Sequence, residues 1–137
     1  MLGDQLGDTS GKITGQRVLP GEDYRFVKME ITFEEHGTVL GGPGMVMGTF
    51  TIFERVPGQL YGQGQGMIFT ADGEGAIWNG HGIGRMSGEG MSASYRFSLA
   101  VQAPTGGKLA RLNSVLLIGE HESDAENNTR SKLWEWK

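Results

Sequence analysis

The chain alternates between segments in which every second residue is apolar and short breaks rich in glycine, asparagine and aspartate. A period of two is typical of β-strands with one buried face, and no segment has a convincing helical period. The residues in the breaks tolerate the left-handed backbone that tight hairpins require. We predict strands at Lys12–Leu19, Arg25–Glu35, Met45–Val56, Gln59–Thr70, Glu74–Met86, Met91–Gln102, Leu112–Ser123 and Thr129–Trp136.

Eight strands joined in order by short hairpins form an antiparallel meander. An open meander exposes two unpaired edges, and closure into a barrel removes both. We therefore predict an all-β fold, an eight-stranded antiparallel up-and-down barrel similar to the calycins. It occupies residues 12–137 as a single domain, preceded by a flexible segment at residues 1–11. A flat two-sheet sandwich is the alternative.

Composition and charge exclude several classes of function. The 137 residues are enough for one domain with its own core. Twelve basic and sixteen acidic residues give a net charge of -4, and no Lys/Arg cluster forms a phosphate-binding face, so no nucleic-acid partner is expected. No apolar run approaches the ~20 residues of a membrane span, and the N-terminal residues have no signal-peptide pattern. We expect a cytoplasmic protein with no membrane partner.

No motif for a metal or cofactor is present in the sequence. The absence of cysteine excludes disulfides and thiolate metal sites, and the three histidines show no HxH pairing. The segment Gly80–Gly84 superficially resembles a dinucleotide-binding loop, but such a loop precedes a helix and no helix is predicted there. We therefore expect no metal and no cofactor.

Hairpin lengths predict which side chains share one face of the sheet. With a two-residue loop at 57–58 and a three-residue loop at 71–73, the facing pairs are Glu54–Tyr61, Ile52–Gln63, Phe50–Gln65, Gln63–His81, Gln65–Asn79 and Met67–Ile77. This face has the bulk to fill a barrel, and we assign it to the interior. Its other members are Val46, Val56, Phe69 and Ile83.

The opposite face of the same strands is nearly bare, and we assign it to the outside of the barrel. It carries Gly62, Gly64, Gly66, Gly80, Gly82 and Gly84 with Thr49, Thr51, Phe53 and Trp78. Two interpretations stay open. Phe53 and Trp78 lie across the glycines and cover them, or a second subunit approaches the bare backbone.

The strand predicted at Met91–Gln102 has a clear apolar face. Its inward residues are Met91, Ala93, Tyr95, Phe97, Leu99 and Val101. A three-residue loop at 88–90 places Tyr95 beside Ile83 and Phe97 beside His81. A two-residue loop turns His81 outward instead, because a one-residue slip moves every side chain to the other face.

The predicted interior is apolar except for one cluster of polar side chains. Burying such groups without partners costs roughly 1–3 kcal/mol each, so the cluster is a candidate site for one small ligand. Desolvation brings a carboxyl group closer to general acid–base range, and a histidine within reach can exchange its proton. The predicted catalytic residues are Glu54 and His81, and the predicted substrate-binding residues are Tyr61, Gln63, Gln65, Asn79, Tyr95 and Phe97.

These residues also have a purely structural interpretation. Glu54 ends a strand and can reach water at the barrel rim, and carboxylates are rarely fully buried. His81 faces the lumen in one register only. The two glutamines alternate with glycines as an exposed amide ladder does, and the two tyrosines supply apolar area like other barrel-wall residues.

The segment Glu120-His121-Glu122 alternates its side chains between the two faces of a strand. Its carboxylates are predicted to pair across the last hairpin with Lys132 and Arg130, each pair contributing about 0.2–1 kcal/mol. We interpret this segment as structural.

The stretch Asn79–Gly88 resembles the glycine-rich strand, of the form G-G-T-G-x-F followed by a turn glycine, of the allene oxide cyclase and dirigent class of small barrels. It differs at the threonine position, which is His81, and at the phenylalanine position, which is Gly84. The resemblance implies apolar, often fatty-acid-derived or polyketide, ligands in the lumen, no cofactor, and a homodimer or homotrimer. The C-terminal half, in the stretches Gly107–Asn113 and Lys132–Lys137, is similar to small uncharacterised bacterial proteins, which implies no activity.

Three hypotheses of function follow. The first is a cofactor-independent isomerase or cyclase that acts on a small, largely apolar molecule in the lumen, with Glu54 and His81 as acid and base. The second is a lipocalin-like protein that binds such a molecule without chemistry. The third is a structural or interaction barrel whose glycine strip, with Trp134 or Trp136, is the working surface. Fold alone does not separate them.

Overall fold

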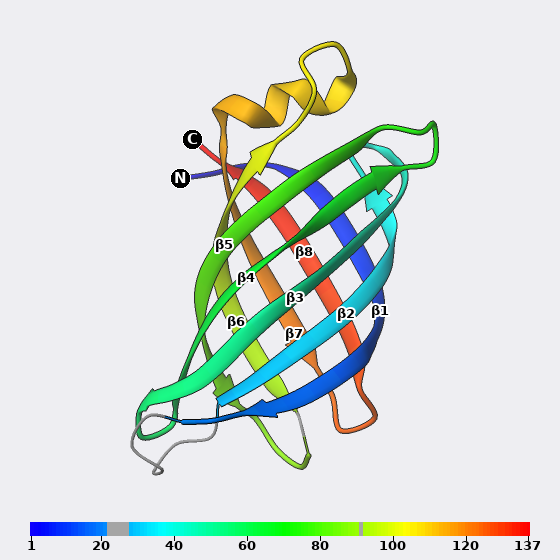
Figure 1. The fold of residues 1–137 in the computed structure, drawn as a ribbon. Coiled ribbons are helices and arrows are strands. Elements are labelled where there is room, and N and C mark those ends of the chain that lie inside the picture. Colours follow the sequence, from blue (N-terminus) through cyan, green and yellow to red (C-terminus); the bar gives the residue numbers. More distant parts are fainter. Residues whose placement is uncertain (22–27, 91) are drawn as a thin grey trace.

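The computed structural model describes residues 1–21, 28–90 and 92–137 and shows a closed antiparallel barrel (Figure 1). Each strand pairs with its neighbours in the chain, and β1 pairs with β8 to close the sheet. The predicted eight-stranded up-and-down barrel is confirmed. The strands are β1 (Leu2–Leu19), β2 (Lys28–Val39), β3 (Gly42–Val56), β4 (Gln59–Thr70), β5 (Gly75–Met86), β6 (Ala93–Gln102), β7 (Leu116–Ser123) and β8 (Asn128–Trp136).

The N-terminal residues belong to the barrel. Residues 1–11, predicted as a flexible segment that precedes the barrel, are instead part of it, because β1 begins at Leu2 and residues 7–12 pair with β2 on one side and β8 on the other. These residues therefore supply the strand that closes the sheet.

The two ends of the chain also meet: the Met1 amino group donates a hydrogen bond to the Lys137 carbonyl oxygen over 2.6 Å, and the Lys137 N–H donates to the Met1 carbonyl oxygen over 2.8 Å.

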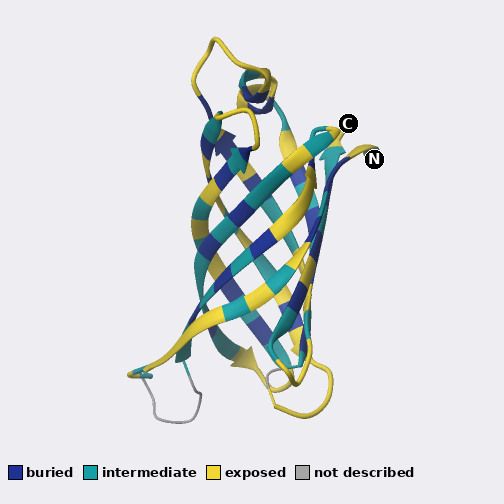
Figure 2. Ribbon diagram, turned by 90° about the vertical axis from the view of Figure 1, so that its right-hand side faces the viewer, coloured by how far each residue is buried: buried dark blue, intermediate teal, exposed yellow. Residues whose placement is uncertain are grey.

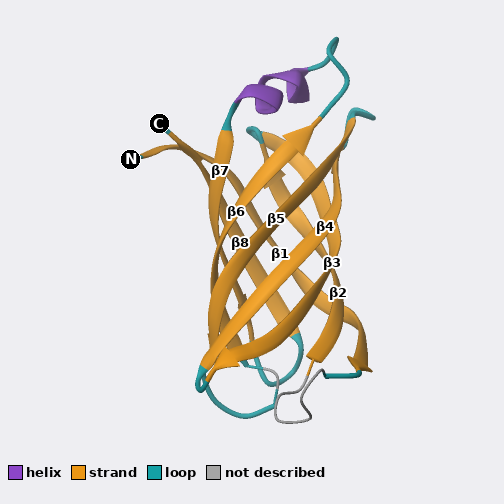
Figure 3. Cartoon of the chain, turned by 60° about the vertical axis from the view of Figure 1, so that its left-hand side comes forward, coloured by secondary structure: helices purple, strands orange, loops and turns teal. Residues whose placement is uncertain are grey.

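A short 3-10 helix, η1 (Lys108–Ser114), lies across one end of the barrel between β6 and β7 (Figure 3). The sequence predicted a strand from Leu112, but β7 begins only at Leu116. Leu109 and Leu112 of the helix are buried in the core, and the Leu109 N–H donates to Glu74 Oε1 over 3.3 Å. This end of the barrel is therefore covered by apolar side chains. Among the described residues, no helix is long and apolar enough to cross a membrane.

The pairing of β3 with β4 differs from the prediction by one residue. Glu54 lies opposite Leu60 and Val56 opposite Gln59, which leaves Arg55 as an extra residue in a β-bulge. Tyr61 consequently lies opposite Phe53 rather than Glu54. The slip turns the glycines of β4 inward and its glutamines outward, whereas Val46, Phe50 and Ile52 of β3 are on the inward face as predicted.

The pairing of β4 with β5 is the predicted one, with Gln63 opposite His81, Gln65 opposite Asn79 and Met67 opposite Ile77. Because β5 keeps this register with β4, the inward and outward faces of β5 are exchanged as well. The predicted interior positions Met67, Ile77 and Ile83 are exposed, and Val56 beside the turn is exposed too. The row of glycines assigned to the outer surface lies on the inward face instead.

In β6 the described apolar residues face inward as predicted, with Ala93, Tyr95, Leu99 and Val101 buried; Met91 lies outside the described residues. Their partners on β5 differ by one position. Tyr95 lies opposite Gly84 and Phe97 opposite Gly82, so the predicted pairs Tyr95–Ile83 and Phe97–His81 are wrong.

The inward glycines make room for aromatic rings. A Cβ atom at Gly66 would lie 2.6 Å from the Trp78 ring, one at Gly84 would lie 2.3 Å from the Tyr95 ring, and one at Gly119 would lie 2.2 Å from the Phe97 ring. Trp78 therefore does cover glycines, as one interpretation of the sequence held, but inside the barrel. Buried and exposed residues alternate along the strands (Figure 2).

Two apolar clusters fill the lumen. The larger one includes Leu109 and Leu112 of η1 together with Trp78, and the smaller one contains Ile31, Ile52, Leu60, Ala93 and Tyr95. Phe50 packs against both clusters. The rings of Tyr95 and His121 lie 5.7 and 5.8 Å from the Phe50 ring. The histidine is thus placed in the middle of the barrel, between its two apolar halves.

Candidate functional site

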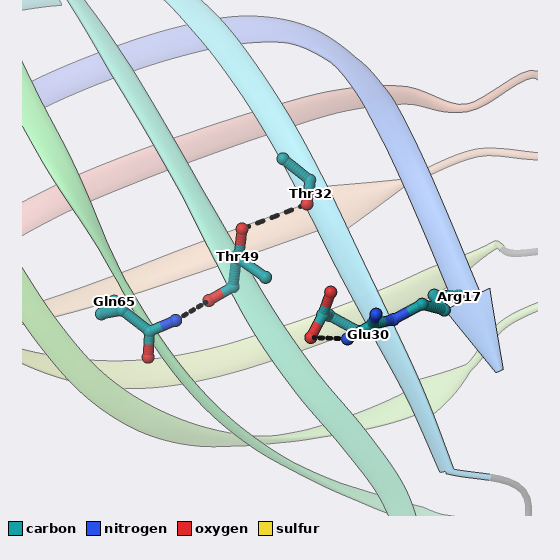
Figure 4. A network of polar contacts seen from close by, with 5 residues as sticks. All are labelled: Arg17, Glu30, Thr32, Thr49 and Gln65. Atoms are coloured by element: carbon teal, nitrogen blue, oxygen red, sulfur yellow. Dashed lines mark hydrogen bonds and ion pairs between the residues drawn. The ribbon is translucent and has the colours of Figure 1, made fainter. Parts of the chain in front are cut away.

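The polar side chains predicted to line the lumen lie on the outer surface of β4 and β5. Gln63, Gln65, Asn79 and His81 are exposed, because the bulge at Arg55 reverses the faces of these strands. Gln65 donates a hydrogen bond to the Thr49 carbonyl oxygen on the outer wall, as Figure 4 shows. A reaction in the lumen therefore cannot use these four side chains.

Tyr61 lies on the outer face, and Glu54 lies at the rim of the barrel rather than deep in the lumen. The Tyr61 hydroxyl lies 3.4 Å from His81 Nδ1, and its ring packs on the outer face against Phe53 and under the Arg55 guanidinium. Glu54 is half-buried near the β3–β4 turn, where its Oε1 accepts a hydrogen bond from the Gly58 N–H over 3.2 Å. Among the described contacts, none joins Glu54 to His81. Of the predicted site residues, only Tyr95 and Phe97 lie inside the barrel.

A different set of polar side chains lies inside the barrel. Thr9 of β1, Glu35 of β2, His121 of β7 and Ser131 of β8 are all buried. The strand register brings them together, since Ser131 lies opposite both His121 and Thr9, and Gly11 of β1 lies opposite Glu35. Four strands that follow one another around the barrel therefore build one polar cluster.

Glu35 and His121 form the centre of this cluster. The Glu35 side chain has no exposed surface; its Oε1 accepts a hydrogen bond from Thr9 Oγ1 over 2.8 Å, and its Oε2 lies 3.5 Å from His121 Nδ1. The same Nδ1 atom lies 2.7 Å from Ser131 Oγ. Within the described part of the chain, Glu35 Oε2 has no hydrogen bond, so the 3.5 Å approach to the imidazole is its main polar contact.

The electrostatics of the lumen favour neutral side chains. Burial lowers the pKa of His121 below its usual 6.5, although the charges of Glu35 and Glu122 oppose the shift. Burial also raises the pKa of Tyr95 to about 12. At neutral pH the imidazole is therefore uncharged and the phenol keeps its proton.

A cavity of about 90 Å³ adjoins this cluster. Aromatic rings and glycine backbone make up much of its wall. It is lined by Thr9, Phe33, Val46, Phe50, Gly62, Gln63, Gly64, Trp78, Gly80, His81, Gly82, Tyr95, Phe97, Leu99, His121, Ser131 and Leu133. The cavity is smaller than the apolar cavity of about 150 Å³ that accepts benzene, so a molecule with a single small ring is the largest ligand that we expect it to take. Among the described residues, no group of three or more His, Cys, Asp or Glu side chains could hold a metal ion.

The sequence contained a signal for this site that we did not use. If Glu120 and Glu122 pair outward with Lys132 and Arg130, the alternation of a strand forces His121 inward. The structure has these registers, with Glu120 opposite Lys132 and Glu122 opposite Arg130. Glu35 likewise continues the inward row of Ile31 and Phe33 on β2. Thr9 could not be found in the same way, because its segment was placed outside the barrel.

The fold and the site together define an up-and-down barrel with a buried acid–histidine pair beside a small lumen cavity. No family model and no curated protein matches the chain. Several solved structures share its fold, among them the following two. A protein with unknown function from Clostridium acetobutylicum ATCC 824 has a TM-score of 0.78, 13% identity and coverage of 98% of both chains. A conserved protein of unknown function from Rhodopseudomonas palustris has a TM-score of 0.77 and 16% identity, over 98% of this chain and 97% of its own. At this level of identity the similarity shows the fold alone.

Proposed function

We propose that the barrel binds a small, largely apolar molecule in its lumen. The observation that carries the proposal is the cavity of about 90 Å³, which has aromatic rings and glycine backbone for walls and a few polar side chains, His121, Ser131 and Thr9. Apolar cavities with a few placed polar groups are the usual form of small-molecule sites.

The glycines of the wall support this proposal. Trp78 and Phe97 already cover part of the glycine surface, yet a Cβ atom at Gly62 would meet nothing closer than 3.4 Å. The space beside Gly62 is thus left open although a single methyl group would fit. A core built only for stability would be packed to uniform density.

The test is the binding of toluene, followed by ligand-observed NMR and by calorimetry. We expect saturable binding at one site, and we expect Gly62→Val to weaken it at least tenfold because the added side chain enters the cavity. Gln65→Val, an outward-facing change on the same strand, is the matched control and leaves binding unchanged. Toluene that fails to bind, or binds equally well to Gly62→Val, contradicts a lumen site.

The resemblance to the allene oxide cyclase and dirigent class agrees with an apolar lumen ligand, and we carry it only as far as this proposal. A cytoplasmic location and a homodimer or homotrimer are further parts of the proposal. Cell fractionation and sedimentation velocity of the purified protein test them, and a monomer at high concentration contradicts the oligomer.

A further inference from the structure

We propose that Glu35 and His121 form an acid–base pair that moves a proton on a neutral, enolisable carbonyl compound held in the lumen. In this assignment His121 Nε2 is the base, Glu35 is the positioning residue behind it, and the Tyr95 hydroxyl is the hydrogen-bond donor to the carbonyl oxygen. The inference rests on the proposed function, because it needs a molecule in the cavity.

The contacts of His121 define which ring nitrogen is available. Nδ1 is engaged, with Ser131 Oγ at 2.7 Å and Glu35 Oε2 at 3.5 Å. A carboxylate on that side favours the tautomer with its proton on Nδ1, which leaves Nε2 unprotonated. Within the described part of the chain, Nε2 has no hydrogen-bond partner, and His121 lines the cavity. The free lone pair is therefore the one that a ligand in the cavity can meet.

Glu35 fits the role of the positioning residue. A carboxylate with no exposed surface and one oxygen lacking a hydrogen bond is costly in a core, and Thr9 satisfies only the other oxygen. The unsatisfied Oε2 faces Nδ1. It lies where the positive charge appears when the imidazole takes up a proton, so the ion pair becomes strongest in the protonated state that a base must pass through.

Tyr95 supplies the complementary group. It lines the same cavity, its ring centroid is 5.9 Å from that of His121, and its hydroxyl has no hydrogen-bond partner within the described part of the chain. Its pKa of about 12 keeps the phenol protonated, so it can donate a hydrogen bond to an oxygen that gains negative charge. The base, His121, and the hydrogen-bond donor, Tyr95, thus line the same cavity.

The reaction needs no oxidant and no further reactant. His121 Nε2 takes a proton from the carbon next to the carbonyl group; the electron pair of that C–H bond forms a C=C bond, and the carbonyl π pair moves to the oxygen, where it accepts the Tyr95 hydrogen bond. The imidazolium trades this proton with solvent water and then returns one to the same carbon, or, in an unsaturated compound, passes its proton to a carbon two positions further. The first outcome is exchange of the proton, and the second is isomerisation.

The experiment follows deuterium exchange into the α-positions of cyclopentanone in D₂O by ¹H NMR. We expect exchange above the buffer rate in the unmodified protein, a loss of 100-fold or more in His121→Gln, and smaller losses in Glu35→Gln and Tyr95→Phe. His81→Gln is the matched control, because that histidine is on the outer surface, and it retains full exchange. Protein-catalysed exchange that survives in His121→Gln overturns the assignment.

Two further measurements separate the possible failures. Binding of cyclopentanone and of toluene is measured alongside exchange. Bound cyclopentanone without exchange overturns the acid–base pair and leaves the binding function intact, as does a lumen that takes toluene but not cyclopentanone. If neither binds, both proposals fail. Long-range ¹H–¹⁵N NMR of the unmodified protein reports the tautomer of His121 even if the variants do not fold, and a proton on Nε2 overturns the assignment.

Discussion

Glu35 Oε2 lies 3.5 Å from His121 Nδ1, between strands β2 and β7, and both side chains are buried in the lumen. Removing one member of such a pair leaves the other without its partner, which typically costs about 3–5 kcal/mol, whereas replacing both with apolar groups is often near neutral. We expect His121→Leu to lower the free energy of unfolding by about 3–5 kcal/mol. The double variant Glu35→Leu/His121→Leu should lose clearly less, as measured by urea denaturation.

The matched control for this comparison of single and double variants is Glu54→Leu/His81→Leu. Glu54 lies at the end of the barrel beside the β3–β4 turn and His81 on the outer surface, so the change in stability should stay within about 0.5 kcal/mol. Losses from Glu35 and His121 that simply add in the double variant would show that the two side chains are not energetically coupled.

Acid should destabilise the barrel through His121. Because burial lowers its pKa in the folded state below 6.5, the unfolded chain binds more protons than the folded chain as the pH falls through 6.5. The contribution of the neutral His121 to the free energy of unfolding is therefore fully present above pH 6.5, and it is lost as the pH falls toward the lower, folded-state pKa. We expect the Tm to decrease in this window and to decrease less in Glu35→Leu/His121→Leu. His36→Gln, on the exposed end of β2, serves as the control; an equal acid response in the double variant contradicts the assignment.

Alkali should act through Tyr95. Its folded-state pKa of about 12 lies above the usual 10.0, so the unfolded chain releases this proton first. The free energy of unfolding therefore decreases as the pH rises from 10 toward 12, because the folded state keeps a proton on Tyr95 that the unfolded state has given up. Tyr95→Phe should lessen this loss in denaturation curves recorded across the window. Tyr61→Phe, whose ring lies on the outer face, is the comparison, and a response equal to that of Tyr95→Phe would be the contradictory result.

Two glycines of β4 should respond in opposite ways to alanine. A Cβ atom at Gly66 would lie 2.0 Å from the Met47 carbonyl oxygen and 2.6 Å from the Trp78 ring, so Gly66→Ala should cost about 1–3 kcal/mol. Gly62→Ala meets no atom closer than 3.4 Å and should be neutral or stabilise by about 0.4–1 kcal/mol, since it restricts the unfolded chain. Thermal denaturation of the two variants tests the contrast, and equal losses would mean that the glycine wall is uniformly packed.

The sequence was sufficient to predict the barrel but not to predict which residues line its lumen. Alternation and turn residues predict the eight strands, their order and even the β4–β5 register, because these depend on local chemistry. The inner face of β4 and β5 depends on whether Arg55 is paired or bulged, and a bulge has no clear signature in one sequence. A single extra residue therefore moved Gln63 and His81 from lumen to surface.

The site was missed for a second reason. Bulky side chains indicate an interior face, and by this criterion the glycine faces of β4 and β5 belong to the outside. In the structure the glycines of β4 and β5 lie under the large rings of Trp78, Tyr95 and Phe97, which belong to β5 itself and to its neighbour β6. A large ring on one strand thus fills the space that a glycine leaves on the paired strand, and alternation along one strand does not report it.

The meeting of Met1 and Lys137 has a consequence for the order of the chain. With β1 hydrogen-bonded to β8, the strands form a ring of hairpins in which no strand is first by geometry. A short linker between the two ends and a cut at the exposed turn Pro57-Gly58 would give a circular permutant with every strand pair preserved. In such a chain the buried pair of β2 and β7 would keep its neighbours, although the order in which the ribosome makes them would change.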